Sequence, residues 1–178
     1  ELSDAQRTSL AAFLSSSEQK PASKTLADLS LQALNCTACH DRDGIGGADA
    51  ARTAYFTGDH NLGDTGLHPP PLTDAGRKFK PDWLKGVLEG KNRVRPYLQT
   101  KMPRFGKATD ALPALLAEAD AKEEKPLPEG DVEAGRKLLG VLGGNSCITC
   151  HKWAERPSLG IQALDISNLD KRLKAGWL

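Results

Sequence analysis

Apolar residues recur at helical spacing in several separate stretches of the chain. The first helix is predicted over residues 3–14, with Ser3 or Asp4 as its N-cap. A second helix is predicted to begin at Ser23, also a capping residue, and its leucines share one broad face: Leu26, Leu29, Leu31 and Leu34. The second pattern therefore indicates an amphipathic helix.

Further helices are predicted over residues 81–88, around residues 112–116 and over residues 132–142, the last capped by Asp131. Residues 41–66 contain six glycines and no sustained periodicity, which is typical of a long loop. A loop of this length needs a ligand or a function to hold it in place. The predicted fold class is therefore all-α.

The order of elements repeats along the chain. A Cys-x-x-Cys-His motif begins at Cys36 and again at Cys147, 111 residues later, and residues 72–84 align without gaps to residues 166–178. We therefore expect residues 1–20 to form a helix that closes a preceding unit, residues 21–121 a first domain, residues 122–130 a charged and Pro-rich linker, and residues 131–178 the N-terminal part of a second domain. The interrupted repeat predicts that the chain is a fragment of a longer protein.

Composition narrows the function classes. The 24 basic and 23 acidic residues leave a formal charge of +1, and the two signs are interspersed, which argues against nucleic-acid binding. No apolar run reaches the roughly 18 to 20 residues of a membrane helix. The nine aromatic residues and the apolar share of 39% are small for a core built from side chains alone, so a non-protein group is expected to supply apolar mass.

The two Cys-x-x-Cys-His motifs use all four cysteines: Cys36, Cys39, Cys147 and Cys150. This spacing is the attachment signature of c-type haem, in which two thiols form thioethers and the next histidine binds iron. His40 and His151 are the predicted proximal ligands. A four-thiolate zinc site or disulfides would leave both histidines without a role, and no β-α-β pattern supports a thioredoxin-like pair. Two covalently attached haem c groups are the expected cofactors.

The distal face of each iron is a separate question. Met102 is the only methionine, and it lies in a Pro-flanked loop 62 residues after His40, so it is the predicted distal ligand of the first haem. The second unit contains no methionine. Three alternatives remain for it: a ligand beyond residue 178, a histidine (His60 or His68) that crosses over from the first unit, or an open site.

The chain resembles class I cytochrome c domains in tandem, through CTACH, the PPPL turn, the Trp83 helix, RPYLQTKMPRFG and a closing helix. It is also similar to cytochrome domains of large exported proteins of the planctomycete kind. The resemblance implies that the helix before the motif crosses the last helix, that the Pro70 carbonyl accepts the Nδ1 hydrogen of His40, and that Leu72 packs on the haem. It also implies haem propionate contacts from Trp83, Arg93 and Arg95, with Trp177 equivalent to Trp83.

These features predict a dihaem c-type cytochrome that transfers electrons by an outer-sphere route, because both axial positions of the first iron are taken. The alternative is a dihaem, peroxidase-like oxidoreductase with an open catalytic second haem. A structural or haem-storing domain is a third class. Redox proteins or a fused enzyme domain are the expected partners. The resemblance implies a periplasmic or extracellular location, since haem is attached to such motifs outside the cytoplasm.

Overall fold

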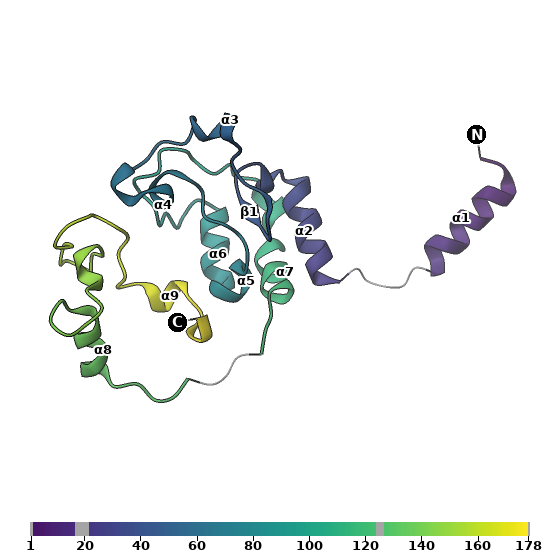
Figure 1. The fold of residues 1–178 in the computed structure, drawn as a ribbon. Coiled ribbons are helices and arrows are strands. Elements are labelled where there is room, and N and C mark those ends of the chain that lie inside the picture. Colours follow the sequence, from purple (N-terminus) through teal and green to yellow (C-terminus); the bar gives the residue numbers. More distant parts are fainter. Residues whose placement is uncertain (1, 17–21, 124–126, 178) are drawn as a thin grey trace.

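The computed structural model describes residues 2–16, 22–123 and 127–177. This part of the chain is mostly helical with little strand, as predicted. The longer helices are α1 (Asp4–Ser16), α2 (Ser23–Ala33), α6 (Pro81–Leu88), α7 (Leu112–Ala119) and α8 (Val132–Leu139) (Figure 1). No helix in the described ranges is long and apolar enough to span a membrane.

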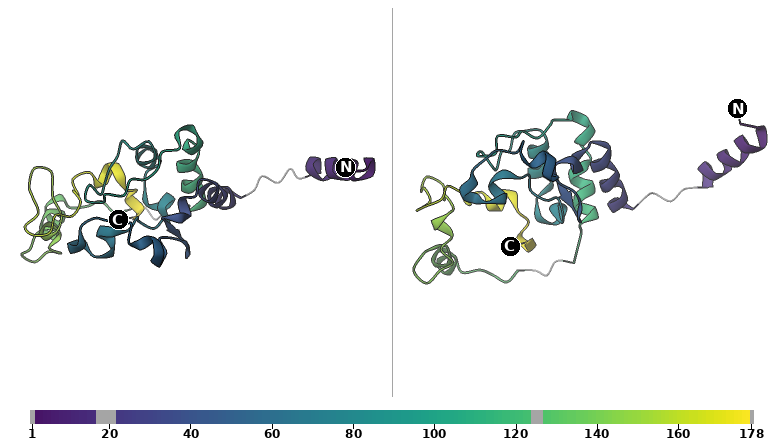
Figure 2. Two further views of the ribbon diagram at one scale, coloured as in Figure 1. Left: turned by 90° about the horizontal axis from the view of Figure 1, so that it is seen from above. Right: turned by 45° about the horizontal axis from the view of Figure 1, so that its top comes forward.

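Helix α1 stands away from the other elements in each view (Figures 1 and 2). It begins with a reciprocal capping box: Ser3 Oγ accepts from the Gln6 backbone N–H at 3.3 Å, and Gln6 Oε1 accepts from the Ser3 N–H at 2.8 Å. The side chains of residues 2–15 are all exposed. The predicted helix is therefore present, and its N-terminus is fixed by local capping rather than by burial.

The core of the first unit lies between α2 and α7. Ala27 and Leu31 of α2 pack against Leu112 and Leu116 of α7, and all four are at most 4% exposed. The helix before the first motif therefore packs on the last helix of this unit. Ser23 is the first residue of α2 rather than its cap: the N-cap is Ala22, which makes no side-chain cap hydrogen bond. The capping prediction for Ser23 is wrong.

Residues 41–66 contain more structure than the sequence suggested. A two-stranded antiparallel sheet pairs β1 (Asp41–Arg42) with β2 (Ile45–Gly46), and short helices follow: α3 (Ala50–Thr53), η2 (His60–Leu62) and α4 (Asp64–Leu67). Asp49 caps α3 and Asp59 caps η2 through backbone N–H groups two or three residues on. The segment is held by these local turns, which no hydrophobic periodicity reveals.

The second unit is smaller. Its helix α8 begins after Asp131, whose carboxylate accepts from the N–H groups of Glu133 and Ala134 at 2.8 and 3.0 Å, as predicted. The remaining elements are η4 (Cys147–Thr149), α9 (Leu169–Arg172) and η5 (Ala175–Trp177). They match η1 (Cys36–Ala38), α5 (Ala75–Lys78) and the start of α6 in the first unit. The duplication read from the sequence is thus repeated in the secondary structure.

A backbone bridge joins the two units at equivalent positions. Phe79 pairs antiparallel with Leu173, its counterpart in the sequence alignment. The Lys80 N–H donates to the Arg172 carbonyl at 3.0 Å, and the Lys174 N–H donates to the Lys78 carbonyl at 3.0 Å. Each unit therefore gives and accepts the same hydrogen bond, which is the pattern of a local two-fold relation. Helix α9 lies beside α5 and α6 as a result (Figure 1).

Candidate functional site

Both cysteine motifs adopt one local conformation. The residue before each first cysteine is left-handed, with φ 56° at Asn35 and at Ser146. A short 3-10 turn follows, and the N–H of each motif histidine donates to the carbonyl of the first cysteine, at 3.0 Å for His40 and 2.9 Å for His151. This tight turn holds the two cysteines and the histidine of each motif in one compact segment.

The chain after the first motif folds back over it. The Gly47 N–H donates to the carbonyls of Thr37 and His40, at 2.9 and 3.1 Å. Gly46 has φ +86°, and a Cβ there would lie 2.4 Å from the Thr37 oxygen, so only glycine fits this approach. In the second unit, the N–H groups of Leu159 and Gly160 make the corresponding contacts. They donate to the carbonyls of Ile148 and Thr149 at 3.0 and 2.9 Å.

Each motif histidine is oriented by a backbone carbonyl. Nδ1 of His40 lies 2.6 Å from the Pro70 oxygen, which is the hydrogen bond that the family resemblance implies. Nδ1 of His151 lies 2.9 Å from the oxygen of Leu164, the residue aligned with Pro70. A carbonyl can only accept, so Nδ1 carries a hydrogen in both rings, and in the neutral form of each ring Nε2 keeps its lone pair. This arrangement fixes the tautomer of a metal-ligating histidine.

The surroundings of the His40 ring favour its neutral form. Burial lowers the pKa of His40, the hydrogen bond to Pro70 opposes this, and the positive charge of Arg95 lowers the pKa further. Burial likewise raises the pKa of the Cys36 thiol, partly offset by its own backbone and reinforced by Cys39. A raised thiol pKa is the opposite of what redox-active Cys-x-x-Cys pairs show.

The four cysteines are free thiols and half-buried. Within the described ranges, no three His, Cys, Asp or Glu side chains come together as ligands of one metal ion. The two motifs therefore do not join into one four-thiolate cluster, and each must be considered as a site in its own unit.

The other predicted cofactor contacts lie on both sides of the bridge. Leu72 packs against the α2–α7 core, as does Cys36. Trp83, on α6, lines a cavity of about 110 Å³ together with residues of the second unit. Trp177 lies under two cations of the first unit: Arg77 Cζ and Lys78 Nζ are each 5.4 Å from its ring centroid. The two tryptophans thus occupy equivalent positions near the boundary between units.

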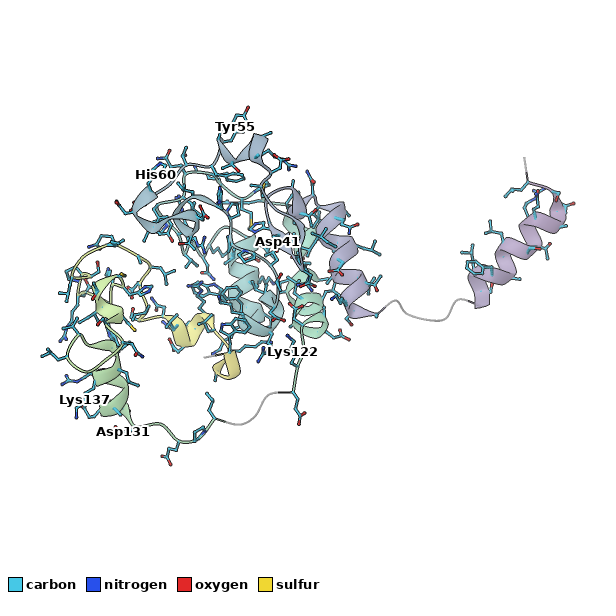
Figure 3. All side chains as sticks on the ribbon, viewed as in Figure 1. Asp41, Tyr55, His60, Lys122, Asp131 and Lys137 are labelled. Carbon is cyan, nitrogen blue, oxygen red and sulfur yellow. The ribbon has the colours of Figure 1, made fainter. Side chains whose placement is uncertain are left out.

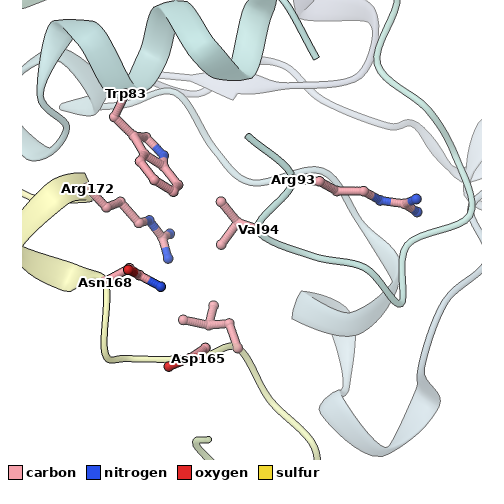
Figure 4. Close-up of a pocket in the computed structure, with 7 residues that line it drawn as sticks. Trp83, Arg93, Val94, Asp165, Asn168 and Arg172 are labelled. Carbon is pink, nitrogen blue, oxygen red and sulfur yellow. The ribbon is translucent and has the colours of Figure 1, made fainter. Parts of the chain in front are cut away.

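Arg93 and Arg95 donate to backbone carbonyls. Arg93 Nη2 bonds the Pro96 and Leu98 oxygens at 3.2 and 2.6 Å, and Arg95 Nη1 bonds the Thr65 and His68 oxygens at 2.9 and 3.1 Å. Arg93 contributes to the cavity lining, but its guanidinium points away from Trp83 (Figure 4). Of the two, Arg95 is the one whose charge acts on His40.

The candidate distal residues differ in exposure. Met102 lies in the irregular segment before η3 (Gly106–Thr109), and 40% of its surface is exposed. His60 is exposed at the outer edge of the long loop, as is Tyr55 (Figure 3). His68 packs edge-on against Phe56 within the first unit, with ring centroids 6.1 Å apart. Its Nε2 is buried without a hydrogen-bond partner among the described residues.

Arg42 and Asp120 form a buried ion pair that the sequence did not reveal. Arg42 Nη2 lies 2.7 Å from Asp120 Oδ1, and these side chains are 4% and 7% exposed. The guanidinium also bonds Asp28 at 3.0 Å and the Leu72 carbonyl at 2.9 Å, while Asp120 accepts from the Gly76 N–H at 2.8 Å. Burial alone would lower the pKa of Arg42, but the bonds to Asp120 and Asp28 raise it.

This network ties the strand after the motif, the turn before α5, and the end of α7 to one another. The two partners are 78 residues apart in the sequence, and each belongs to a polar stretch. No sequence signal distinguishes them from the other charged residues around them.

The sequence analysis also did not single out Lys78 and Arg172. The repeat alignment places these two cations at equivalent positions of the two units.

No family model, curated protein or solved structure matches the chain.

Proposed function

We propose that the chain is a dihaem c-type cytochrome module that transfers electrons by an outer-sphere route. The observation that carries this proposal is the repeated arrangement of the two motif histidines. Each follows a Cys-x-x-Cys pair, donates Nδ1–H to the carbonyl at the equivalent position (Pro70 or Leu164), and retains a free Nε2 lone pair. Two thiols and an oriented imidazole in each unit fit covalent haem with iron bound at Nε2.

The small core supports the same proposal. Only eight apolar side chains are buried among the described residues, and just one of these, Leu173, belongs to residues 131–177. A unit of this size cannot repay its conformational entropy with one buried leucine. A porphyrin in each unit would supply the missing apolar contact, and at roughly 25 cal/mol per Å² its burial would contribute several kcal/mol.

Electron transfer follows from the residues assigned to the first iron. His40 would hold the iron through Nε2, and Met102, the single thioether in the chain, is proposed as the second protein ligand. When bound, haem supplies the one-electron couple, and the protein supplies ligands, orientation and a partly dry setting. With His40 and Met102 both holding the iron, no position would remain for a substrate, so the first site would transfer electrons without binding one. The proposed partners are redox proteins or a fused enzyme domain, and the proposed location is outside the cytoplasm, where such motifs receive haem.

Mass spectrometry tests the assignment directly. The protein would be expressed in cells that mature c-type cytochromes and weighed under denaturing conditions. We expect a mass increase of two haem groups, falling to one for Cys36→Ala/Cys39→Ala or for Cys147→Ala/Cys150→Ala. The bare polypeptide mass would refute the proposal.

A Met102→Ala variant tests the distal ligand. We expect loss of the sulfur-to-iron charge-transfer band and a lower midpoint potential for the first haem, because the soft thioether favours ferrous iron. A spectrum unchanged from that of the unsubstituted protein would refute the assignment.

A peroxidase-like function is the second candidate, and the absence of methionine from the second unit is what favours it. It requires an open iron beside His151. The ferric spectrum distinguishes the two candidates: a high-spin second haem that binds cyanide and reacts with peroxide supports the enzyme, whereas two low-spin haems support the electron carrier.

A further inference from the structure

Positive charges gather at the boundary between the two units without acidic partners. Arg172 Cζ lies 5.2 Å from the centroid of the Phe79 ring, and Lys78 Nζ lies 5.3 Å from the same ring. Arg77 and Lys78 also lie over Trp177. None of the three cations forms an ion pair with an acidic group in the described ranges, and the Nε atoms of Arg77 and Arg172 are buried without a hydrogen-bond partner there.

Arg77, Lys78 and Arg172 are half-buried, and a cation that loses part of its hydration without a compensating charge is unfavourable. The pKa of Arg172 is lowered, first by burial and then by the charge of Arg95; the pKa of Lys78 is lowered by burial, by Arg172 and by Arg95. Lys78, Arg95 and Arg172 are therefore close enough to repel one another. Such a cluster is stable when anions lie among them.

A cavity opens beside this cluster. It is lined by Trp83 and Arg93 from the first unit and by Leu164, Asn168 and Arg172 from the second. The Arg172 guanidinium and the Trp83 indole point toward the same space (Figure 4). Asp165 also lines the cavity, but its Oδ1 accepts from Ser167 Oγ at 2.6 Å and from two backbone N–H groups.

The cavity is lined by a residue associated with each candidate haem site. Leu164, whose carbonyl orients His151, lines it from the second unit, and Trp83, the propionate donor expected for the first haem, lines it from the first unit. Carboxylates are the anions that each site is expected to hold, since every haem carries two propionates. The donors present, an indole N–H and guanidinium groups, are suited to carboxylate oxygens.

We propose that the two units exchange cations for their haem propionates. Arg172 of the second unit binds, with Trp83, a propionate of the haem attached at Cys36 and Cys39. By the same duplication, Lys78, the counterpart of Arg172, binds a propionate of the second haem at Trp177, and Arg77 lies over the same ring. This inference rests on the proposed function and goes beyond it: each unit tunes the potential of the other unit's haem, so neither site is complete alone.

An Arg172→Gln substitution in the full haem-loaded chain tests the exchange. A cation beside a propionate offsets negative charge that favours ferric iron, so its removal lowers the reduction potential. We expect a lower midpoint potential for the first haem, identified by its sulfur-to-iron band, and a smaller change for the second. Lys171→Gln is the matched control, since it removes the same charge from an exposed neighbour on α9.

Equal first-haem potentials in Arg172→Gln and Lys171→Gln would overturn the proposal. Arg172→Lys keeps the charge and should retain most of the potential, which separates charge from folding. If the cations instead hold a free anion, phosphate titrated at constant ionic strength would shift the potential of the parent protein but not of Arg172→Gln, and this result would also overturn it. Absence of haem by mass would refute the proposed function itself, whereas two haems with unaltered potentials would refute only the exchange.

Discussion

The buried pair of Arg42 and Asp120 predicts a large loss of stability when one partner is removed. Asp120→Ala would leave a guanidinium that is 4% exposed without its bidentate partner, and the Gly76 N–H without its acceptor. Breaking a buried ion pair in this way costs about 3–5 kcal/mol. Asp28 still bonds the guanidinium but is itself 37% exposed, so we expect it to offset only part of the loss.

Urea unfolding of the purified protein, followed by far-ultraviolet circular dichroism, measures the effect as a lower midpoint at similar slope. Lys122→Ala is the control. Lys122 lies two residues after Asp120 and forms an ion pair with Asp74, but its side chain is 55% exposed, so we expect a loss of stability of only about 0–1 kcal/mol. Arg42→Met/Asp120→Leu should recover much of the stability, since neither charge is then left alone. The reasoning is refuted if Asp120→Ala and Lys122→Ala unfold at the same urea concentration.

Two further predictions concern backbone contacts. A Cβ at Gly76 would lie 1.8 Å from the Leu116 carbonyl oxygen, so Gly76→Ala should destabilise the protein by about 1–3 kcal/mol in the same urea assay. Gly135 is on a helix with open space around it, so Gly135→Ala should stabilise the protein by up to about 1 kcal/mol. A change of the same sign in both variants would contradict this. Lys80 has φ −66°, which suits proline, so Lys80→Pro removes its hydrogen bond to the second unit without backbone strain, at a cost of about 0.5–1.5 kcal/mol. Amide exchange at Lys174 should be faster in Lys80→Pro than in Lys80→Ala, and equal exchange in the two variants would argue against the bridge.

Features set by neighbouring residues could be predicted from the sequence. The start of α6 at Pro81 and the cap of α8 at Asp131 are both as expected, because each depends on one residue and the backbone just after it. The hydrogen bond from His40 to Pro70 followed from the family resemblance. The equivalent bond from His151 to Leu164 was not predicted, because the second unit lacks the prolines of the first; a backbone carbonyl at that position serves with any side chain.

Features set by distant residues could not be predicted. The pairing of Arg42 with Asp120 depends on where the chain brings two ordinary charged residues together, and nothing local marks either one. The cap at Ser23 failed because the backbone turns one residue earlier, at Ala22. The short helices α3 and η2 escaped notice because they are capped by Asp49 and Asp59 rather than held by an apolar face.

The most similar part of the repeat is also the part through which the units meet. Residues 72–84 and 166–178 align without gaps, and the bridge pairs Phe79 with its own counterpart, Leu173. An edge that pairs with a copy of itself satisfies the backbone of both copies at once, so duplication alone supplies a complementary surface. The same symmetry brings Lys78 and its counterpart Arg172 against one ring, Phe79, where two like charges repel. The unfavourable charge pair is therefore a direct consequence of the favourable backbone pairing, and an anion shared at this boundary is the simplest way for the fold to retain both.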